Sequence, residues 1–195
     1  MQNQDPKNLL LQIVGILEKL NISYFVTGGI AVLIWGRPRF TADIDIVVEV
    51  REKDLFPLKS ALKDLSSFGY IELDAMKDAL HQNSEFNYID GNTGMKVDFW
   101  ILKNSKFDQL RLKRRQVKNI FGSDIYFTSA EDLILIKLQW FKESESSRQK
   151  EDIISILKIT SIDEAYIEKM IKELDVAKEL DVAEVWKQVK EEYKK

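Results

Sequence analysis

Apolar positions return with two different periods in the first half of the chain, and these periods predict alternating helices and strands. Where apolar residues recur every three or four positions, we expect helices that bury one face. The first such helix has Asp5 as its N-cap and Pro6 at its first position, which proline tolerates. Short runs of aromatic and β-branched residues instead predict strands. The expected helices span 6–20, 30–35 and 52–65, and the expected strands span 24–27, 44–50 and 68–73.

Two further pairs of strands flank turn-forming sequences. The tetrapeptide at 91–94 combines two glycines with Asn and Thr, and a shorter glycine-containing turn lies at 121–123. Turns of this kind between apolar runs are typical of β-hairpins. The predicted hairpins pair 85–90 with 95–102 and 114–120 with 124–128.

The chain changes character at Ser129. Ser129 and Asp132 fit a helix-capping pattern, and the helix predicted after them runs to a polar segment at 143–147. The remaining residues, 150–195, are rich in Glu and Lys and predict two or three helices. We therefore expect an α+β class of fold in two parts. The expected parts are an α+β domain at 1–128 and a C-terminal helical region packed on it at 129–195.

Composition limits the chemistry that these elements can carry. Hydrophobic residues make up 45% of the 195 residues and charged residues 31%, which is ordinary for a folded protein. The formal net charge of −3 does not indicate a dedicated nucleic-acid binder. The sequence has no cysteine and a single histidine, His81, so thiolate sites are excluded and multi-histidine sites nearly so. A metal would be held by oxygen ligands, which favours Mg²⁺ or Mn²⁺.

The sequence offers no sign of a membrane or a secretory pathway. Its first residues are polar and lack the pattern of a signal peptide. No apolar run approaches the roughly 20 residues that span a bilayer. We therefore expect a cytoplasmic protein with no membrane partner.

A glycine pair, Gly28-Gly29, directly follows the strand predicted at 24–27. Glycine permits a tight turn and a close approach of the backbone, and the N–H groups at a helix start bind anions such as phosphate. The same pair suits an ordinary turn without any ligand. The glycines alone leave both interpretations open.

Two aspartates, Asp43 and Asp45, stand at the start of the strand predicted at 44–50. Successive side chains of a strand alternate between faces, so both aspartates share one face and Ile44 points to the other. Two carboxylates this close repel each other unless a cation or a proton relieves them. They are either ligands of a cation or two solvent-exposed acids, and this segment alone does not decide.

A third aspartate, Asp98, lies within the strand predicted at 95–102, on the same face as Lys96 and Trp100. Aspartate is a poor strand former, so a carboxylate in this position needs a reason. One reason is a salt bridge, with Lys96 as a candidate partner. If this strand neighbours the strand of the other two aspartates, the alternative is a three-carboxylate site for divalent ions.

The glycine pair, the Asp-Ile-Asp sequence and the later strand aspartate together resemble the active-site signature of the polymerase-β-like nucleotidyltransferase superfamily. The surrounding residues resemble more specifically a branch that includes the toxins of type IV (abortive-infection) toxin–antitoxin systems and the antibiotic nucleotidyltransferases. This resemblance implies the nucleotidyltransferase fold, a small mixed β-sheet flanked by helices. It covers residues 22–50 and 95–101 and continues more loosely over 129–138.

The resemblance implies a role for each matching residue. Gly28 and Gly29 would hold the phosphates of an incoming NTP such as ATP, although the second position is often serine, whose hydroxyl is missing here. Asp43 and Asp45 would bind both Mg²⁺ (or Mn²⁺) ions. Asp98 would bind one of these ions and help to activate the acceptor hydroxyl.

Other polar residues match the pattern less closely. Thr41 shares the strand face of the aspartates and would orient a metal-bound water or a phosphate. Arg39, like Arg37, would pair with phosphate oxygens or remain on the surface. Lys137 lies on an apolar helix face and would either contact the triphosphate or extend its stem to solvent. Asp152 resembles an acid of the toxin branch or caps the following helix.

The implied reaction is transfer of a nucleoside monophosphate from an NTP to a hydroxyl, with release of pyrophosphate. The acceptor stays open: a tRNA or a protein suits a toxin with an antitoxin partner, and a small hydroxyl compound suits a resistance enzyme. One alternative is a non-catalytic nucleotide-binding or antitoxin-like interaction domain. Another is an RNA-binding module built on a basic run, for which a solvated surface is the favoured interpretation. This basic run comprises Lys103, Lys106, Arg111, Lys113, Arg114, Arg115 and Lys118.

Overall fold

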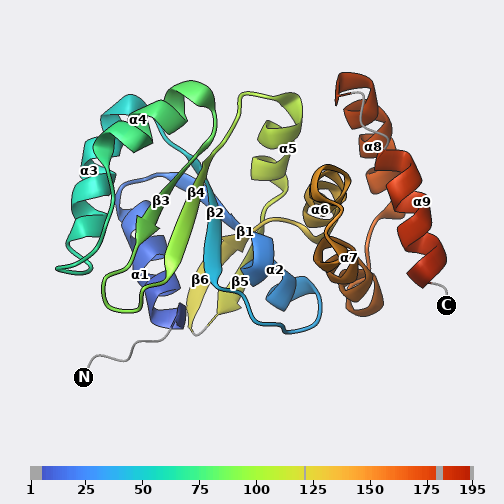
Figure 1. The fold of residues 1–195 in the computed structure, drawn as a ribbon, viewed down its shortest axis with the longest axis horizontal. Coiled ribbons are helices and arrows are strands. Elements are labelled where there is room, and N and C mark those ends of the chain that lie inside the picture. The colour runs from blue at the N-terminus through green and yellow to red at the C-terminus, as the bar shows by residue number, and fades with distance from the viewer. Residues whose placement is uncertain (1–5, 121, 179–181, 194–195) are drawn as a thin grey trace. The chain divides into compact units, whose positions relative to one another are not determined.

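The computed structural model describes residues 6–120, 122–178 and 182–193, which form two compact units (Figure 1). We refer to them as the sheet unit and the helical unit. The sheet unit consists of Met1–Ile30 and Phe40–Phe127, and the helical unit consists of Ala31–Arg39 and Thr128–Lys195. The segment 31–39 therefore groups with the C-terminal helices and not with its neighbours in sequence.

The described strands of the sheet unit form one mixed six-stranded sheet in the order β3-β4-β2-β1-β6-β5. The strand pairs β2/β4 and β1/β6 are parallel, whereas β1/β2, β3/β4 and β5/β6 are antiparallel. The predicted α+β class and both predicted hairpins are thereby confirmed. The strands are β1 (Ser23–Thr27), β2 (Asp43–Glu49), β3 (Glu85–Ile89), β4 (Lys96–Ile101), β5 (Gln116–Ile120) and β6 (Ser123–Phe127).

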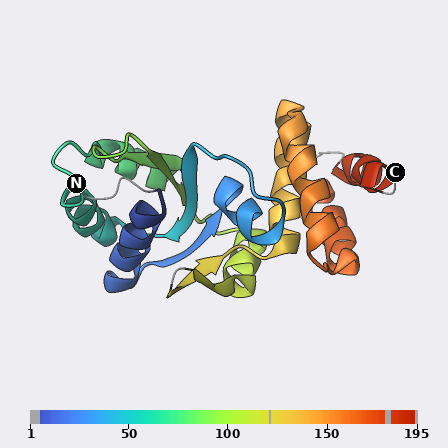
Figure 2. The same ribbon diagram turned by 90° about the horizontal axis from the view of Figure 1, so that it is seen from below.

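Three helices, α1, α3 and α4, lie together on one side of the sheet (Figure 2). The apolar residues of β2 that alternate with its acids, Ile44, Ile46 and Val48, are fully buried, as the strand alternation predicts. Helix α2 begins at the end of β1 and continues into the helical unit. The helices that begin in the sheet unit are α1 (Pro6–Lys19), α2 (Gly28–Trp35), α3 (Glu52–Lys63), α4 (Leu73–Gln82) and α5 (Lys106–Arg114).

The strand predicted at 68–73 is wrong. In this segment only Tyr70 pairs with β3, through a single bridge to Ile89. The chain then enters α4, whose buried residues Met76 and Ala79 are three positions apart, as a helix requires. The aromatic residues Phe68 and Tyr70 favoured a strand in the sequence, but both side chains are exposed to solvent.

Helix α5 was not predicted from the sequence. This helix is strongly polar, but Ser105 caps it by accepting a hydrogen bond from the backbone N–H of Asp108 at 3.0 Å. The predicted N-cap Asp5 and the turn residue Phe121 lie outside the described residues.

The described C-terminal helices are α6 (Ala130–Ser144), α7 (Ser147–Ile159), α8 (Glu164–Lys178) and α9 (Val182–Tyr193). Helices α6 and α7 pack side by side (Figures 1 and 2). The predicted cap is confirmed, because the hydroxyl of Ser129 accepts a hydrogen bond from the N–H of Asp132. The last residue of α2, Trp35, contacts the segment before α6, because its indole donates to the carbonyl of Thr128 at 2.9 Å.

None of the helices in the described residues is both long enough and apolar enough to span a bilayer.

Candidate active site

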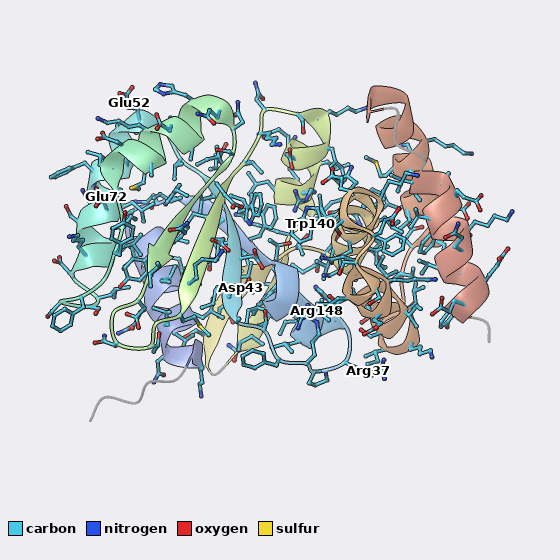
Figure 3. All side chains as sticks on the ribbon, in the orientation of Figure 1. Arg37, Asp43, Glu52, Glu72, Trp140 and Arg148 are labelled. Atoms are coloured by element: carbon cyan, nitrogen blue, oxygen red, sulfur yellow. The ribbon has the colours of Figure 1, made fainter. Side chains whose placement is uncertain are left out.

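Strand pairing brings the three predicted aspartates to one face of two neighbouring strands. Strands β2 and β4 run parallel with Asp45 directly opposite Asp98, and Asp43 opposite Lys96. Side chains that face each other across a strand pair lie on the same side of the sheet. Asp43, labelled in Figure 3, stands at the start of β2. The geometric condition set by the sequence, that the two strands be neighbours, is therefore met.

The carboxylate of Asp45 is held by two N–H groups. The indole Nε1 of Trp100 donates to its Oδ1 at 3.2 Å, and the backbone N–H of Gly29 donates to the same carboxylate. Burial raises the pKa of Asp45 above its ordinary value, and the charges of Asp43 and Asp98 add to this rise against the two hydrogen bonds. A cation bound nearby would stabilise the ionised form of this carboxylate.

The glycine pair contacts Asp45 directly. Gly28 has φ +60, in the left-handed region, and a Cβ atom built on it would overlap the carboxylate of Asp45. Only glycine meets both conditions without strain. The pair therefore has a structural task in this chain, which is to make room for Asp45 and to donate a hydrogen bond to it. Its predicted role as a phosphate site stays a prediction.

Replacing Gly28 by Ala is expected to lower the free energy of unfolding by about 2–3 kcal/mol. The matched control is Gly94→Ala, because Gly94 also has a positive φ, +70, but open space around its Cβ position. Urea denaturation of both variants separates backbone strain, which both share, from overlap with Asp45. If Gly94→Ala is as destabilising as Gly28→Ala, the close contact with Asp45 contributes nothing.

Asp98 is 5% exposed and forms an ion pair with Lys96, whose Nζ lies 2.7 Å from Oδ2. The hydrogen bond to Asp98 raises the pKa of Lys96 despite its partial burial. The other carboxylate oxygen, Oδ1, is buried and has no hydrogen-bond partner among the described residues. The salt bridge considered from the sequence is thus present together with the three-carboxylate arrangement, and it leaves one oxygen of Asp98 unused.

Neighbouring side chains complete this acidic face. Thr41 donates from Oγ1 to Oδ1 of Asp43 at 3.0 Å, so its hydroxyl orients that carboxylate. Thr27, opposite Asp45 on β1, is 2% exposed, and its Oγ1 has no partner among the described residues. Glu85 on β3 also feels the negative charge of this face. Burial and the charges of Asp98 and Asp45 raise the pKa of Glu85, although the charge of Lys96 opposes this rise.

The donors of this face suit a hard divalent cation. The set consists of carboxylate and hydroxyl oxygens, and the unused Oδ1 of buried Asp98 is a polar atom that lacks the partner expected for it. In the described part of the chain, however, no three acidic or histidine side chains converge closely enough to enclose an ion. Each aspartate is instead engaged by its own protein donor, from Thr41, Trp100 or Lys96.

A second cluster, within the helical unit, contains the other predicted phosphate ligands. Arg39 donates to both oxygens of Asp152, from Nε at 2.6 Å and from Nη2 at 2.8 Å. Lys137 lies 2.7 Å from Oδ2 of Asp152 and also donates to Gln149 at 2.9 Å. We call these four residues the Asp152 cluster. The roles of Arg39 and Lys137 toward phosphate stay predictions.

Two alternatives considered for this cluster are wrong. Lys137 does not extend to solvent, because it is 1% exposed. Asp152 does not cap a helix, because it lies in the middle of α7, whose N-cap is Ser146. The sequence distance of 113 residues between Arg39 and Asp152 left no local signal for their pairing.

The basic run does not form a uniform surface. Arg111 is 5% exposed, pairs with Asp108 at 2.8 Å and lies 5.1 Å from the ring centroid of Phe25. Arg115 stacks over the ring of Tyr126 at 4.2 Å. Two of the arginines that the RNA-binding alternative would use are therefore engaged inside the sheet unit. Lys103, Lys106 and Lys113 are exposed.

Two residues of the acidic face were not predicted from the sequence: Thr27, and Trp100 as a donor to Asp45. Trp100 shares the strand face of Asp98, and this alternation was a usable signal. Thr27 gave none, because its position beside Asp45 depends on the antiparallel pairing of β1 with β2.

The fold that carries this site is the nucleotidyltransferase fold, as comparison with solved structures shows. The chain resembles the antibiotic-resistance factor ANT(2'')-Ia in solution, with a TM-score of 0.60 and 14% identity over 88% of this chain and 91% of that one. The crystal structure of ANT(2'')-Ia with adenylyl-2''-tobramycin gives 0.57 and 15%, over 83% and 92%. The lincomycin-bound lincosamide antibiotic adenylyltransferase LnuA gives 0.53 and 18%, over 80% and 98%. No protein-family model and no curated protein matches the sequence.

Proposed function

We propose that the protein transfers a nucleoside monophosphate from an NTP to a hydroxyl acceptor. The observation that supports this proposal most strongly is the direct pairing of Asp45 with Asp98 across β2 and β4 on a nucleotidyltransferase fold. Gly28 and Gly29, packed against the carboxylate of Asp45, add to it. A surface role for these acids would not explain why Asp98 is 5% exposed with one oxygen unused.

In the proposed reaction, the acceptor oxygen forms a bond to the α-phosphorus, and the bond from that phosphorus to the pyrophosphate oxygen breaks. Asp43, Asp45 and Asp98 are the residues that would hold Mg²⁺ or Mn²⁺. When bound, such ions neutralise the charge of the reacting phosphates. Asp98 would accept the proton of the acceptor hydroxyl at Oδ1, which has no hydrogen-bond partner among the described residues.

The remaining predicted contacts belong to the same proposal. Gly28 and Gly29 bind phosphate through the backbone, and Thr41 keeps Asp43 oriented through its hydroxyl. Arg39 and Lys137 supply positive charge for the triphosphate, and Asp152 keeps both side chains ordered. None of these contacts selects a base, so the proposal extends to ATP and to the other NTPs.

The acceptor is RNA, protein or a small hydroxyl compound. ANT(2'')-Ia has been crystallised with adenylyl-2''-tobramycin and LnuA with lincomycin, which favours a small compound by analogy of fold. A tRNA or protein acceptor would instead suit a toxin with an antitoxin partner.

A transfer experiment tests the reaction and the acceptor together. The protein is incubated with cell extract, Mg²⁺ and each α-³²P-labelled NTP in turn, with EDTA as the metal-free control. We expect label from at least one NTP to enter a product in the presence of Mg²⁺ only, and the size of that product distinguishes RNA, protein and small compounds. Calorimetric binding of NTP without any transfer of label would favour a non-catalytic nucleotide-binding domain instead.

A further inference from the structure

Lys96 places a positive charge within the acidic face of the proposed ion site. It lies on β4, two residues before Asp98, and faces Asp43 on β2. Its Nζ is 2.7 Å from Oδ2 of Asp98, and Glu85 on β3 lies on the same face. The ammonium group therefore cancels part of the negative charge that would attract a divalent cation.

The two oxygens of Asp98 are in contrasting states. Lys96 binds Oδ2, while Oδ1 is buried without a hydrogen-bond partner among the described residues. A carboxylate that shares its charge with an ammonium group is a weaker ligand for a second cation, because the two cations repel each other. Lys96 and a divalent ion thus oppose each other at the same side chain.

The side chains of the pair differ in their freedom to move. The side chain of Lys96 is 46% exposed, whereas that of Asp98 is 6% exposed. The long, flexible stem of lysine allows the ammonium group to move into solvent, while Asp98 is held by its surroundings. The ion pair can therefore open without unfolding the strands that carry it.

We propose that Lys96 is a built-in counterion that lowers the affinity of the nucleotide-free site for divalent cations. This inference rests on the proposed function of Asp43, Asp45 and Asp98. Its consequence is an order of binding: the ion enters together with the NTP, whose phosphates supply the negative charge that Lys96 has cancelled. A positioning role, in which Lys96 only holds Asp98 in place for the ion, predicts the opposite effect on ion affinity.

The test is Mn²⁺ binding by nucleotide-free protein, measured from the electron paramagnetic resonance signal of free Mn²⁺. We expect Lys96→Met to lower the Kd for Mn²⁺ about fivefold, because a repelling unit charge is removed. Lys96→Gln is expected to act in the same direction, and Lys96→Arg is expected to bind as the wild type does. The gain is expected to shrink at high ionic strength, since salt screens exposed charges.

Lys77→Met is the matched control. The side chain of Lys77 is 45% exposed and also pairs with an aspartate, Asp74, at 3.8 Å, but Asp74 is 95% exposed. Its removal is expected to leave the Kd for Mn²⁺ unchanged. If Lys77→Met gained the same affinity for Mn²⁺, the effect of Lys96 would come only from the net charge of the protein, and the inference would be overturned.

The outcomes separate this inference from the proposed function. If wild-type protein binds Mn²⁺ and Asp45→Asn loses it, but Lys96→Met and Lys96→Gln bind no more tightly than the wild type, the ion site stands and the counterion role is wrong. If no form binds Mn²⁺ with or without NTP, both proposals fail. Thermal unfolding of each variant in EDTA verifies that the proteins compared are folded.

Discussion

Asp45→Asn is expected to reduce metal-dependent transfer of a nucleoside monophosphate by at least about a thousandfold. Asparagine has the shape of aspartate, so Gly28 still fits against it and the indole N–H of Trp100 still finds an oxygen. The substitution removes the negative charge opposite Asp98 and little else. The initial rate of label transfer from the NTP that the wild type uses, at saturating Mg²⁺, measures the loss.

The same variant is expected to keep or gain stability in metal-free buffer. Burial and the neighbouring charges of Asp43 and Asp98 raise the pKa of Asp45, so its ionised form is less favourable in the folded protein than in the unfolded chain. Neutral asparagine relieves this repulsion. Lost activity with retained stability is typical of a residue kept for function.

Glu49→Gln provides the control for Asp45→Asn. Glu49 lies on the same strand and the same face as Asp43 and Asp45, and it is exposed at the far end of β2. It also exchanges a carboxylate for an amide, but away from Asp98, so transfer is expected to continue at the wild-type rate. Full activity of Asp45→Asn, or an equal loss in Glu49→Gln, would remove Asp45 from the proposed site.

Local patterns predicted much of the sheet unit. The hairpin of β3 and β4 and the hairpin of β5 and β6 follow from glycine-containing turns between apolar runs, because both signals lie within a few residues of each other. The alternation along β2 correctly assigned Asp43 and Asp45 to one face. These features depend on neighbours in sequence, which a single chain displays directly.

The strand pairing that forms the candidate site could not be predicted from local sequence patterns. Asp45 and Asp98 become neighbours through the parallel pairing of β2 with β4, strands that other elements separate in the chain. Such a pairing leaves no turn signal, since parallel strands require a long crossover. The family resemblance suggested that the residues act together, and the structure supplies the register that brings them together.

Burial of charged residues was equally hard to predict. Arg111 belongs to a basic run that favours a solvated surface, but its guanidinium group lies against Phe25 and pairs with Asp108. Lys137 and Asp152 each suggested an exposed or capping role from their own neighbours. Their burial depends on a partner from another segment, and a single sequence does not reveal which opposite charges meet.

Asp152→Ala is expected to lower the free energy of unfolding by about 3–5 kcal/mol. Asp152 is 3% exposed, accepts hydrogen bonds from Arg39 and forms an ion pair with Lys137. Lys137 is itself 1% exposed. Without the carboxylate, Lys137 retains Gln149 as a neutral acceptor but loses the opposite charge. Most of the expected loss comes from this buried and uncompensated ammonium group. Denaturant unfolding in metal-free buffer measures it.

The stability lost in Asp152→Ala is expected to decrease as the pH falls. Burial alone would raise the pKa of Asp152, but the hydrogen bond from Arg39 and the charge of Lys137 outweigh it and hold the pKa below its ordinary value. A carboxylate of this kind contributes its stability above its unfolded pKa of about 4 and loses it as the pH falls through the lower folded value. The difference in the free energy of unfolding between wild type and Asp152→Ala is therefore expected to be constant near neutral pH and to become smaller in acid.

Two further variants identify the cause of the Asp152→Ala effect. Asp74→Ala removes a carboxylate that is 95% exposed from a 3.8 Å ion pair with Lys77, and less than about 0.5 kcal/mol is expected to be lost. Adding Lys137→Met to Asp152→Ala removes the uncompensated charge, so more than half of the lost stability is expected to return. If the double variant is less stable than Asp152→Ala, the ammonium group is not the source of the loss. Asp152 would then act mainly by packing, and its link to Lys137 would be incidental.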